Sequence, residues 1–299
     1  MEFQIRHTGK LLKMTFNGWN DKDPFRQSAV IAYYAIFSIP GLLVLVISIA
    51  GYFFGNDNVN QNILEQISNT MGTETAIQIG EILIKSTQSK STFGGSFIGI
   101  VILLAGSTAV FVELQKTLNL IWHVEVISQK GFLAILKARL FSFGLILAIA
   151  FLLMVSLVVS TALSSTGNWL KTYTYGYMIS IFNVLNFIFS LGVISMLFAL
   201  MFKILPDAKI KWKHVWLGSI VTGVLFTIGQ TVLAYYFSIA DPASIYGVAG
   251  SVILILLWVS YSSMILFFGA EFTAAYARIY SGIIAPTEIA KADNSSIKL

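Results

Sequence analysis

The chain has 299 residues and a formal net charge of +5; 56% of its residues are hydrophobic and 11% are charged. It contains no cysteine, which excludes disulfides, thiolate metal sites and cysteine nucleophiles. The positive charge is spread over segments that flank long apolar runs, so attraction to anionic lipid headgroups explains it and no nucleic-acid partner is indicated.

Apolar runs dominate the chain. Six stretches carry no Asp, Glu, Lys or Arg, and each is long enough to cross a bilayer, which needs about 20 apolar residues. They predict transmembrane helices over residues 29–54, 93–112, 140–163, 178–202, 215–240 and 243–270. The first run is too long for a signal-peptide core and is followed by further runs, so no cleavable signal is predicted. The predicted fold class is therefore all-α, a polytopic membrane protein with six transmembrane helices.

The segments outside the spans complete the predicted organisation. Residues 1–28 form an N-terminal segment in which basic residues stand among apolar ones over 2–19. This pattern suits either a helix on the inner membrane face or an ordinary cytoplasmic helix. The transmembrane domain covers 29–281, and its outer loop, 56–92, shows the periodicity of two short amphipathic helices. The tail, 282–299, is polar and aperiodic from Thr287 and is expected to be disordered.

Basic residues give the orientation, because Lys and Arg are retained on the cytoplasmic side. The N-terminal segment, the second and fourth loops and the tail hold 16 of the 19 Lys and Arg residues, and the opposite loops hold the remaining Lys85, Lys90 and Lys171. Both termini are therefore predicted to be cytoplasmic.

Residues suited to catalysis or metal binding do not cluster in the sequence. The three histidines, His7, His123 and His214, are far apart, and no HxxxH or HExxH spacing surrounds them. Solvated loop histidines are the favoured interpretation, although all three fall on the predicted cytoplasmic side and convergence on a metal stays open. Neither a phosphate-binding loop nor a nucleophile motif is present, so the sequence predicts no enzyme, no cofactor and no metal.

Uncharged polar residues inside the spans are the candidates for a substrate pathway. Pro40 lies near the middle of the first span, where its missing N–H frees the carbonyl of Ile36, and Tyr33 and Ser38 are near enough to bond it. Asn183 and Asn186 share one helical face in the outer half of the fourth span.

Two further residues extend this set. Gln230 lies near the middle of the fifth span, and Trp258, near the middle of the sixth, needs a partner for its indole N–H. These side chains either line a pathway or only hydrogen-bond between helices.

Charged residues at the inner ends of spans suggest a second candidate site. Glu113 and Glu271 follow the second and sixth spans, and Arg139 opens the third at the same depth. They predict either an ion-paired cluster at a cytoplasmic mouth or simple boundary charges facing water.

Three segments carry a resemblance to a known family. AVIAYYAIFSIPGLL at 29–43, VFVELQKTLNLIW at 110–122 and SIYGVAGSVILILLWVSYSSMILFFGAEFTAAYA at 244–277 resemble the YihY/BrkB family of bacterial inner-membrane proteins. The resemblance implies a multi-pass protein of the bacterial inner membrane. The family was once labelled ribonuclease BN, which these residues do not support. The family-type positions are Tyr33, Ser38, Pro40, Asn119, Trp122, Tyr246, Gly247, Trp258, Gly269 and Glu271.

The function predicted from these observations is movement of a lipid-like or amphipathic molecule between leaflets, because the spans contain no charge that would couple ions and suit acyl chains. A non-transporting scaffold or envelope-assembly factor is the alternative, and a small-solute channel is a weaker one. Expected partners are anionic lipids of the inner leaflet, and a second copy or an envelope protein stays open.

Overall fold

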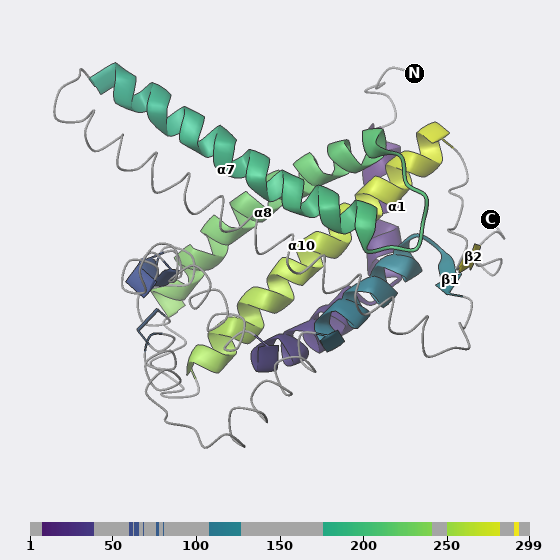
Figure 1. Ribbon diagram of the computed structural model, residues 1–299, viewed down its shortest axis with the longest axis horizontal. Coiled ribbons are helices and arrows are strands. Elements are labelled where there is room, and N and C mark those ends of the chain that lie inside the picture. Colours follow the sequence, from purple (N-terminus) through teal and green to yellow (C-terminus); the bar gives the residue numbers. More distant parts are fainter. Residues whose placement is uncertain are drawn as a thin grey trace.

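The computed structural model describes residues 8–38, 60–61, 63–65, 68, 76–77, 80, 108–126, 176–240, 250–281 and 290–292. The labelled helices of Figure 1 are α1 (Thr8–Asn20), α7 (Gly176–Ile204), α8 (Trp212–Ala240) and α10 (Gly250–Ser281). Residues 24–38 and 108–121 are also helical. The protein is therefore an all-α membrane protein, as predicted.

Three of these helices are long and apolar enough to cross a membrane. They run over Val184–Ile204, Trp212–Phe237 and Val252–Tyr280, and they correspond to the predicted fourth, fifth and sixth spans. The predicted third span, 140–163, lies outside the described residues, as do most of the first and second, so the count of six stays a prediction. In the loop 56–92 the described residues are helical, and the rest lie outside.

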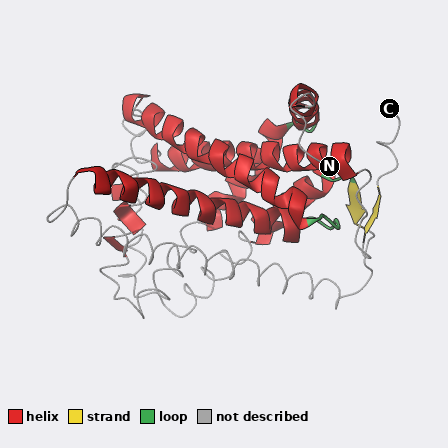
Figure 2. Cartoon of the chain, turned by 90° about the horizontal axis from the view of Figure 1, so that it is seen from above, coloured by secondary structure: helices red, strands yellow, loops and turns green. Residues whose placement is uncertain are grey.

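The helices pack side by side in the order α7, α8, α10 and α1. Figure 2 shows the helices, in red, from above, with the two strands near the C-terminus. Figure 1 shows α7 crossing α8, and the two helices diverge from the crossing towards the N-terminal end of α7. The crossing lies in the C-terminal half of α7 and the N-terminal half of α8, where a Cβ on Gly223 would lie 2.6 Å from Ser195 Oγ. The bundle therefore has a packed end, where α7 finishes, α8 starts and α10 finishes, and an opposite end at which α7 and α8 are apart.

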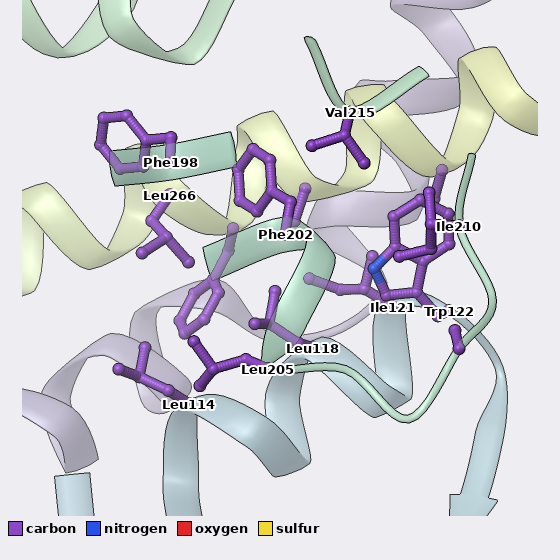
Figure 3. Packing of buried hydrophobic residues seen from close by; sticks show 14 of the residues in the cluster. Leu114, Leu118, Ile121, Trp122, Phe198, Phe202, Leu205, Ile210, Val215 and Leu266 are labelled. Atoms are coloured by element: carbon purple, nitrogen blue, oxygen red, sulfur yellow. The ribbon is translucent and has the colours of Figure 1, made fainter. Parts of the chain in front are cut away.

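The main hydrophobic core lies at the packed end (Figure 3). It combines Leu118 and Trp122 from the helix 108–121 and its end with Phe202 from α7, Val215 from α8 and Leu266 from α10. Each of these side chains is at most 6% exposed. Segments distant in the sequence therefore meet in one core, and this core holds in place the helices that carry the polar residues around it.

Local signals explain where the helices at this end stop and start. After α1 the chain turns at Asp23, which has a positive φ of 53°, and Pro24 opens the next helix, where its missing N–H is no loss. The helix 108–121 ends before His123, whose φ of 53° is typical of a residue just beyond a helix end. Arg278 Nη2 donates to the carbonyl of Ile121 at 3.0 Å and so satisfies an acceptor that the helix leaves open.

Strands β1 (Val124–Val126) and β2 (Ala290–Ala292) pair antiparallel, with Glu125 opposite Lys291. The prediction of a disordered tail is therefore wrong for residues 290–292. With only three residues, Ala290–Ala292, the strand is too short for its apolar and polar pattern to identify it in the sequence, and its pairing partner lies far away in the chain.

Two predicted boundaries also differ from the helices. The helix at 108–121 continues past residue 112, and α10 continues from residue 270 to Ser281. Both predictions ended a span at the first carboxylate, Glu113 or Glu271. A charged residue does not end a helix, however, and each of these carboxylates has a basic partner that offsets its cost.

Candidate functional site

The first polar contact of the packed end is a buried ion pair between α10 and the residues just after α1. Glu271 of α10 is 1% exposed, and Lys22 Nζ donates to its Oε2 at 3.0 Å. Lys22 also donates to the carbonyl of Gly18 at 3.1 Å. Because an unpaired buried charge is strongly unfavourable, the contact with Lys22 offsets the cost of burying the Glu271 carboxylate. We refer to Gly18, Trp19, Lys22 and Glu271 as the latch.

The latch requires the backbone of α1 to approach α10 closely. A Cβ atom on Gly18 would lie 2.3 Å from Glu271 Oε1, so no larger residue fits without displacing the carboxylate. Next to it, Trp19 Nε1 donates to the carbonyl of Met264 in α10 at 3.2 Å. The two contacts on α10 lie seven residues apart, about two helical turns, and they hold α1 along the C-terminal half of α10.

A second polar contact joins the helix 108–121 to the connection between α7 and α8. The carboxylate of Asp207 accepts hydrogen bonds from Asn119 Nδ2 at 2.9 Å and from Gln115 Nε2 at 3.1 Å. In return, the backbone N–H of Asp207 donates to Asn119 Oδ1 at 2.8 Å. Asn119 therefore uses both ends of its amide on one residue, which requires a side chain that carries a donor and an acceptor together.

Further hydrogen bonds extend this polar layer. Thr117 Oγ1 lies 3.2 Å from Gln27 Oε1, which links the helix 108–121 to the helix 24–38. Lys203 at the end of α7 donates to the carbonyl of Ile210, and its ammonium lies 5.8 Å from the centre of the Trp212 ring. Lys203 at the end of α7 therefore contacts both the end of the connection, at Ile210, and the first residue of α8, Trp212.

Glycines and threonines fit reciprocally where α8 crosses α10. A Cβ on Gly218 of α8 would lie 1.7 Å from Thr273 Oγ1, and a Cβ on Gly269 of α10 would lie 1.8 Å from Thr222 Oγ1. Each threonine donates to the carbonyl of the glycine four residues before it on its own helix, at 2.6 Å from Thr222 and 2.7 Å from Thr273. We refer to these four residues as the glycine–threonine contact.

A family model described as Virulence factor BrkB matches residues 15–291. The chain belongs to the YihY/BrkB family.

Relatives carry the name UPF0761 membrane protein. One from Tolumonas auensis is 25% identical over 86% of this chain and 81% of its own length, and one from Haemophilus influenzae is 23% identical over 84% and 89%. One from Saccharophagus degradans is 24% identical over 90% of this chain and 60% of its own length. These names describe membrane proteins and state no enzymatic activity. No solved structure matches the chain significantly.

Several BrkB-type positions lie at the packed end. Asn119 bonds Asp207, Trp122 is in the core, Gly269 belongs to the glycine–threonine contact and Glu271 to the latch. Each therefore has a packing or hydrogen-bonding role between helices. Tyr246 and Gly247, two further family-type positions, lie outside the described residues.

The predicted pathway residues are described in part. Ser38 is buried and donates to the backbone carbonyl of Ala35 at 3.1 Å. Tyr33 is 58% exposed and its ring packs edge-on against Tyr34 and Phe37. Pro40 lies outside the described residues.

The other pathway residues lie on α7, α8 and α10. Asn186 is partly buried, and its Oδ1 is enclosed without a hydrogen-bond partner in the described part of the chain. Trp258 packs edge-on against Phe226 of α8, with ring centres 6.0 Å apart. Gln230 is partly buried, and the side chain of Asn183 is not described. The convergence of these residues on one cavity therefore stays a prediction.

The predicted charge cluster is also described in part. Glu113 pairs with Lys116 on its own helix at 3.1 Å, and Glu271 pairs with Lys22, so the two carboxylates have different basic partners. Arg139 lies outside the described residues, and a shared cluster stays a prediction.

The histidines give no metal centre within the residues that the structure describes. Among these residues, no three His, Cys, Asp or Glu side chains gather as metal ligands. His214 is 5% exposed and its ring packs against that of Tyr276, with centres 5.5 Å apart. It is therefore a buried residue of the packed end, whereas the prediction had it in a solvated loop. His7 lies outside the described residues.

The latch and the glycine–threonine contact were not predicted. A signal for the second is nevertheless present, because α8 and α10 both contain Gly followed four residues later by Thr, at 218–222 and 269–273. Small residues at that spacing allow two helices to approach closely. For the latch, the presence of Lys22 near Glu271 has no local sequence signal.

Proposed function

We propose that this membrane protein of the YihY/BrkB family moves or gates a lipid-like, amphipathic molecule between the two leaflets of the bacterial inner membrane. The observation that supports it most is the uneven packing along α7 and α8. At the packed end the side chains of Phe198, Phe202, Val215 and Thr222 are at most 8% exposed.

At the opposite end, large apolar side chains of both helices are exposed. On α7, Val184, Leu185, Phe187 and Ile188 are between 55% and 58% exposed. On α8, the exposed side chains at this end are Ile228, Val232, Tyr235, Tyr236 and Ile239. Such a surface is unfavourable in water, whereas lipid acyl chains contact apolar side chains without this free-energy penalty.

Asn186 lies within the exposed segment of α7, and its Oδ1 has no partner among the described residues. An amide oxygen without a donor is unfavourable in hydrocarbon, by about 1–3 kcal/mol. The hydroxyl, ammonium or amide of a lipid headgroup would supply that donor. The Asn186 oxygen would therefore bind the polar headgroup of an amphipathic molecule, and the apolar surface beside it would bind the acyl chains.

The test is leaflet exchange of fluorescent phosphatidylethanolamine and phosphatidylglycerol in proteoliposomes. We expect the wild-type protein to accelerate exchange over protein-free vesicles. Asn186→Leu should slow it about fivefold, the equivalent of roughly 1 kcal/mol of lost interaction. Val184→Leu, two residues away, introduces the same side chain at a lipid-facing position and should have no effect. No exchange above protein-free vesicles would favour the scaffold alternative, and selective leakage of small solutes would favour a channel.

We propose six spans with both termini in the cytoplasm, so that the packed end lies on the inner side. This rests on the distribution of Lys and Arg. Because the chain has no cysteine, single-cysteine variants report position without background. A membrane-impermeant maleimide should label Thr75→Cys in intact cells, and Lys209→Cys only after permeabilisation. Labelling of Lys209→Cys in intact cells would reverse the proposed orientation.

A further inference from the structure

Helix α1 presents three different faces. Leu11, Thr15 and Gly18 face the bundle, where Leu11 packs against Phe272 and Tyr276 of α10. At 3.6 residues per turn, Leu12 and Phe16 fall on a second, apolar stripe beside the buried face. Lys10, Lys13 and Asn17 fall on a third stripe, which is polar and exposed.

The apolar stripe is exposed and continues beyond α1. Leu12 is 49% exposed, Phe16 is 56% exposed and Phe25, at the start of the next helix, is 65% exposed. Trp19 connects them, because its ring centre lies 6.0 Å from that of Phe16 and 6.2 Å from that of Phe25. Large apolar side chains gathered in this way are unfavourable in water, so a stripe of this kind is typical of a surface that contacts an apolar partner.

The charge of α1 indicates the chemistry of that partner. The helix contains two lysines, both exposed, and no carboxylate. Around α1 the buried face is followed by the apolar stripe and then by the basic stripe. This order matches an orientation in which the apolar stripe enters the acyl region of the bilayer and the lysines lie at the headgroups.

We propose that Leu12, Phe16 and Phe25 insert between the acyl chains of the leaflet at the packed end, and that Lys10 and Lys13 bind anionic phospholipid headgroups there. The latch fixes the orientation of this surface, because Trp19 and Lys22 hold α1 on α10. Anionic lipid in this leaflet therefore binds the same helix whose other face packs against α10. This inference does not depend on whether the protein transports lipid.

The test uses the full-length protein with one fluorophore, attached to a cysteine at position 16 or, as the control, at position 17. Each variant is reconstituted with phosphatidylcholine and phosphatidylglycerol, one of which carries brominated acyl chains. We expect brominated lipid to quench the fluorophore at Phe16→Cys strongly and that at Asn17→Cys weakly, with iodide in the water giving the reverse. Both side chains are exposed, so neither substitution removes a core contact.

The same measurement tests the preference for anionic lipid. Brominated phosphatidylglycerol should quench position 16 more than brominated phosphatidylcholine at equal mole fraction. Lys10→Gln and Lys13→Gln should each lower the relative affinity for phosphatidylglycerol about fivefold. Quenching of position 16 by iodide alone would make α1 an ordinary water-exposed helix, and protection from both quenchers would indicate a protein cover such as a second copy. Equal quenching by the two lipids would remove the headgroup preference. Each of these results overturns the proposal.

Discussion

Gly218→Ala and Gly269→Ala will each destabilise the protein, because each added methyl group collides with a threonine of the facing helix. A Cβ at position 218 would lie 1.7 Å from Thr273 Oγ1 and one at position 269 would lie 1.8 Å from Thr222 Oγ1, so α8 and α10 must move apart. Overpacking of this kind costs about 1–3 kcal/mol. The measurement is the free energy of unfolding in mixed micelles by detergent denaturation.

Two matched variants separate this collision from a general effect of removing glycine. At Gly192 of α7 an added Cβ would have no other atom within 4 Å, so Gly192→Ala should be neutral or stabilise the helix by about 0.5–1 kcal/mol. Gly218→Ala combined with Thr273→Gly removes the colliding atoms and should recover part of the loss. If Gly218→Ala and Gly192→Ala have the same effect, the close approach of α8 and α10 does not limit stability.

Lys22→Met will destabilise the protein by about 3–5 kcal/mol, since it leaves the carboxylate of Glu271 buried without its counter-charge. Glu271→Gln should cost less, because the Lys22 side chain is 14% exposed and its flexible ammonium can reach water. The double variant Lys22→Met with Glu271→Leu should be more stable than Lys22→Met alone. Unfolding of the four proteins under one set of conditions gives the coupling energy.

The exposed pair of Arg26 and Asp23 is the control for this experiment. Its atoms lie 3.2 Å apart, close to the 3.0 Å of the buried pair, but its side chains are 71% and 60% exposed. Arg26→Met should therefore leave the unfolding free energy unchanged within error. An equal loss in Lys22→Met and Arg26→Met would mean that burial of Glu271 does not determine the effect.

The membrane-spanning helices could be predicted because their signal is local. An uncharged run of sufficient length identifies a span without any knowledge of its neighbours. Helices α7 and α8 follow the predicted runs closely, and α10 overlaps the predicted sixth span but ends later. The boundaries were less accurate for the same reason. Glu271 was placed at a span end on its charge alone, whereas its partner Lys22 lies 249 residues away.

The roles of individual polar residues depended on partners that the sequence does not reveal. The family resemblance identified Asn119 as a family-type position, but its hydrogen bonds go to Asp207, 88 residues further along the chain. In the glycine–threonine contact, each helix shows a Gly followed four residues later by Thr. Neither sequence indicates, however, that the glycine of one helix lies against the threonine of the other. The residue pattern of one helix predicts which of its positions are buried. Which residues of two helices contact each other can be known only once the arrangement of the helices is known.

The latch also constrains the order of biosynthesis. Lys22 is synthesised 249 residues before Glu271, an interval on the order of ten seconds to a minute at typical translation rates. During this interval the lysine has no counter-charge from α10, and α1 has no surface on which to seat Gly18 and Trp19. Helix α1 can therefore dock through the latch only after α10 has been synthesised, so this docking is a late step in the folding of the bundle.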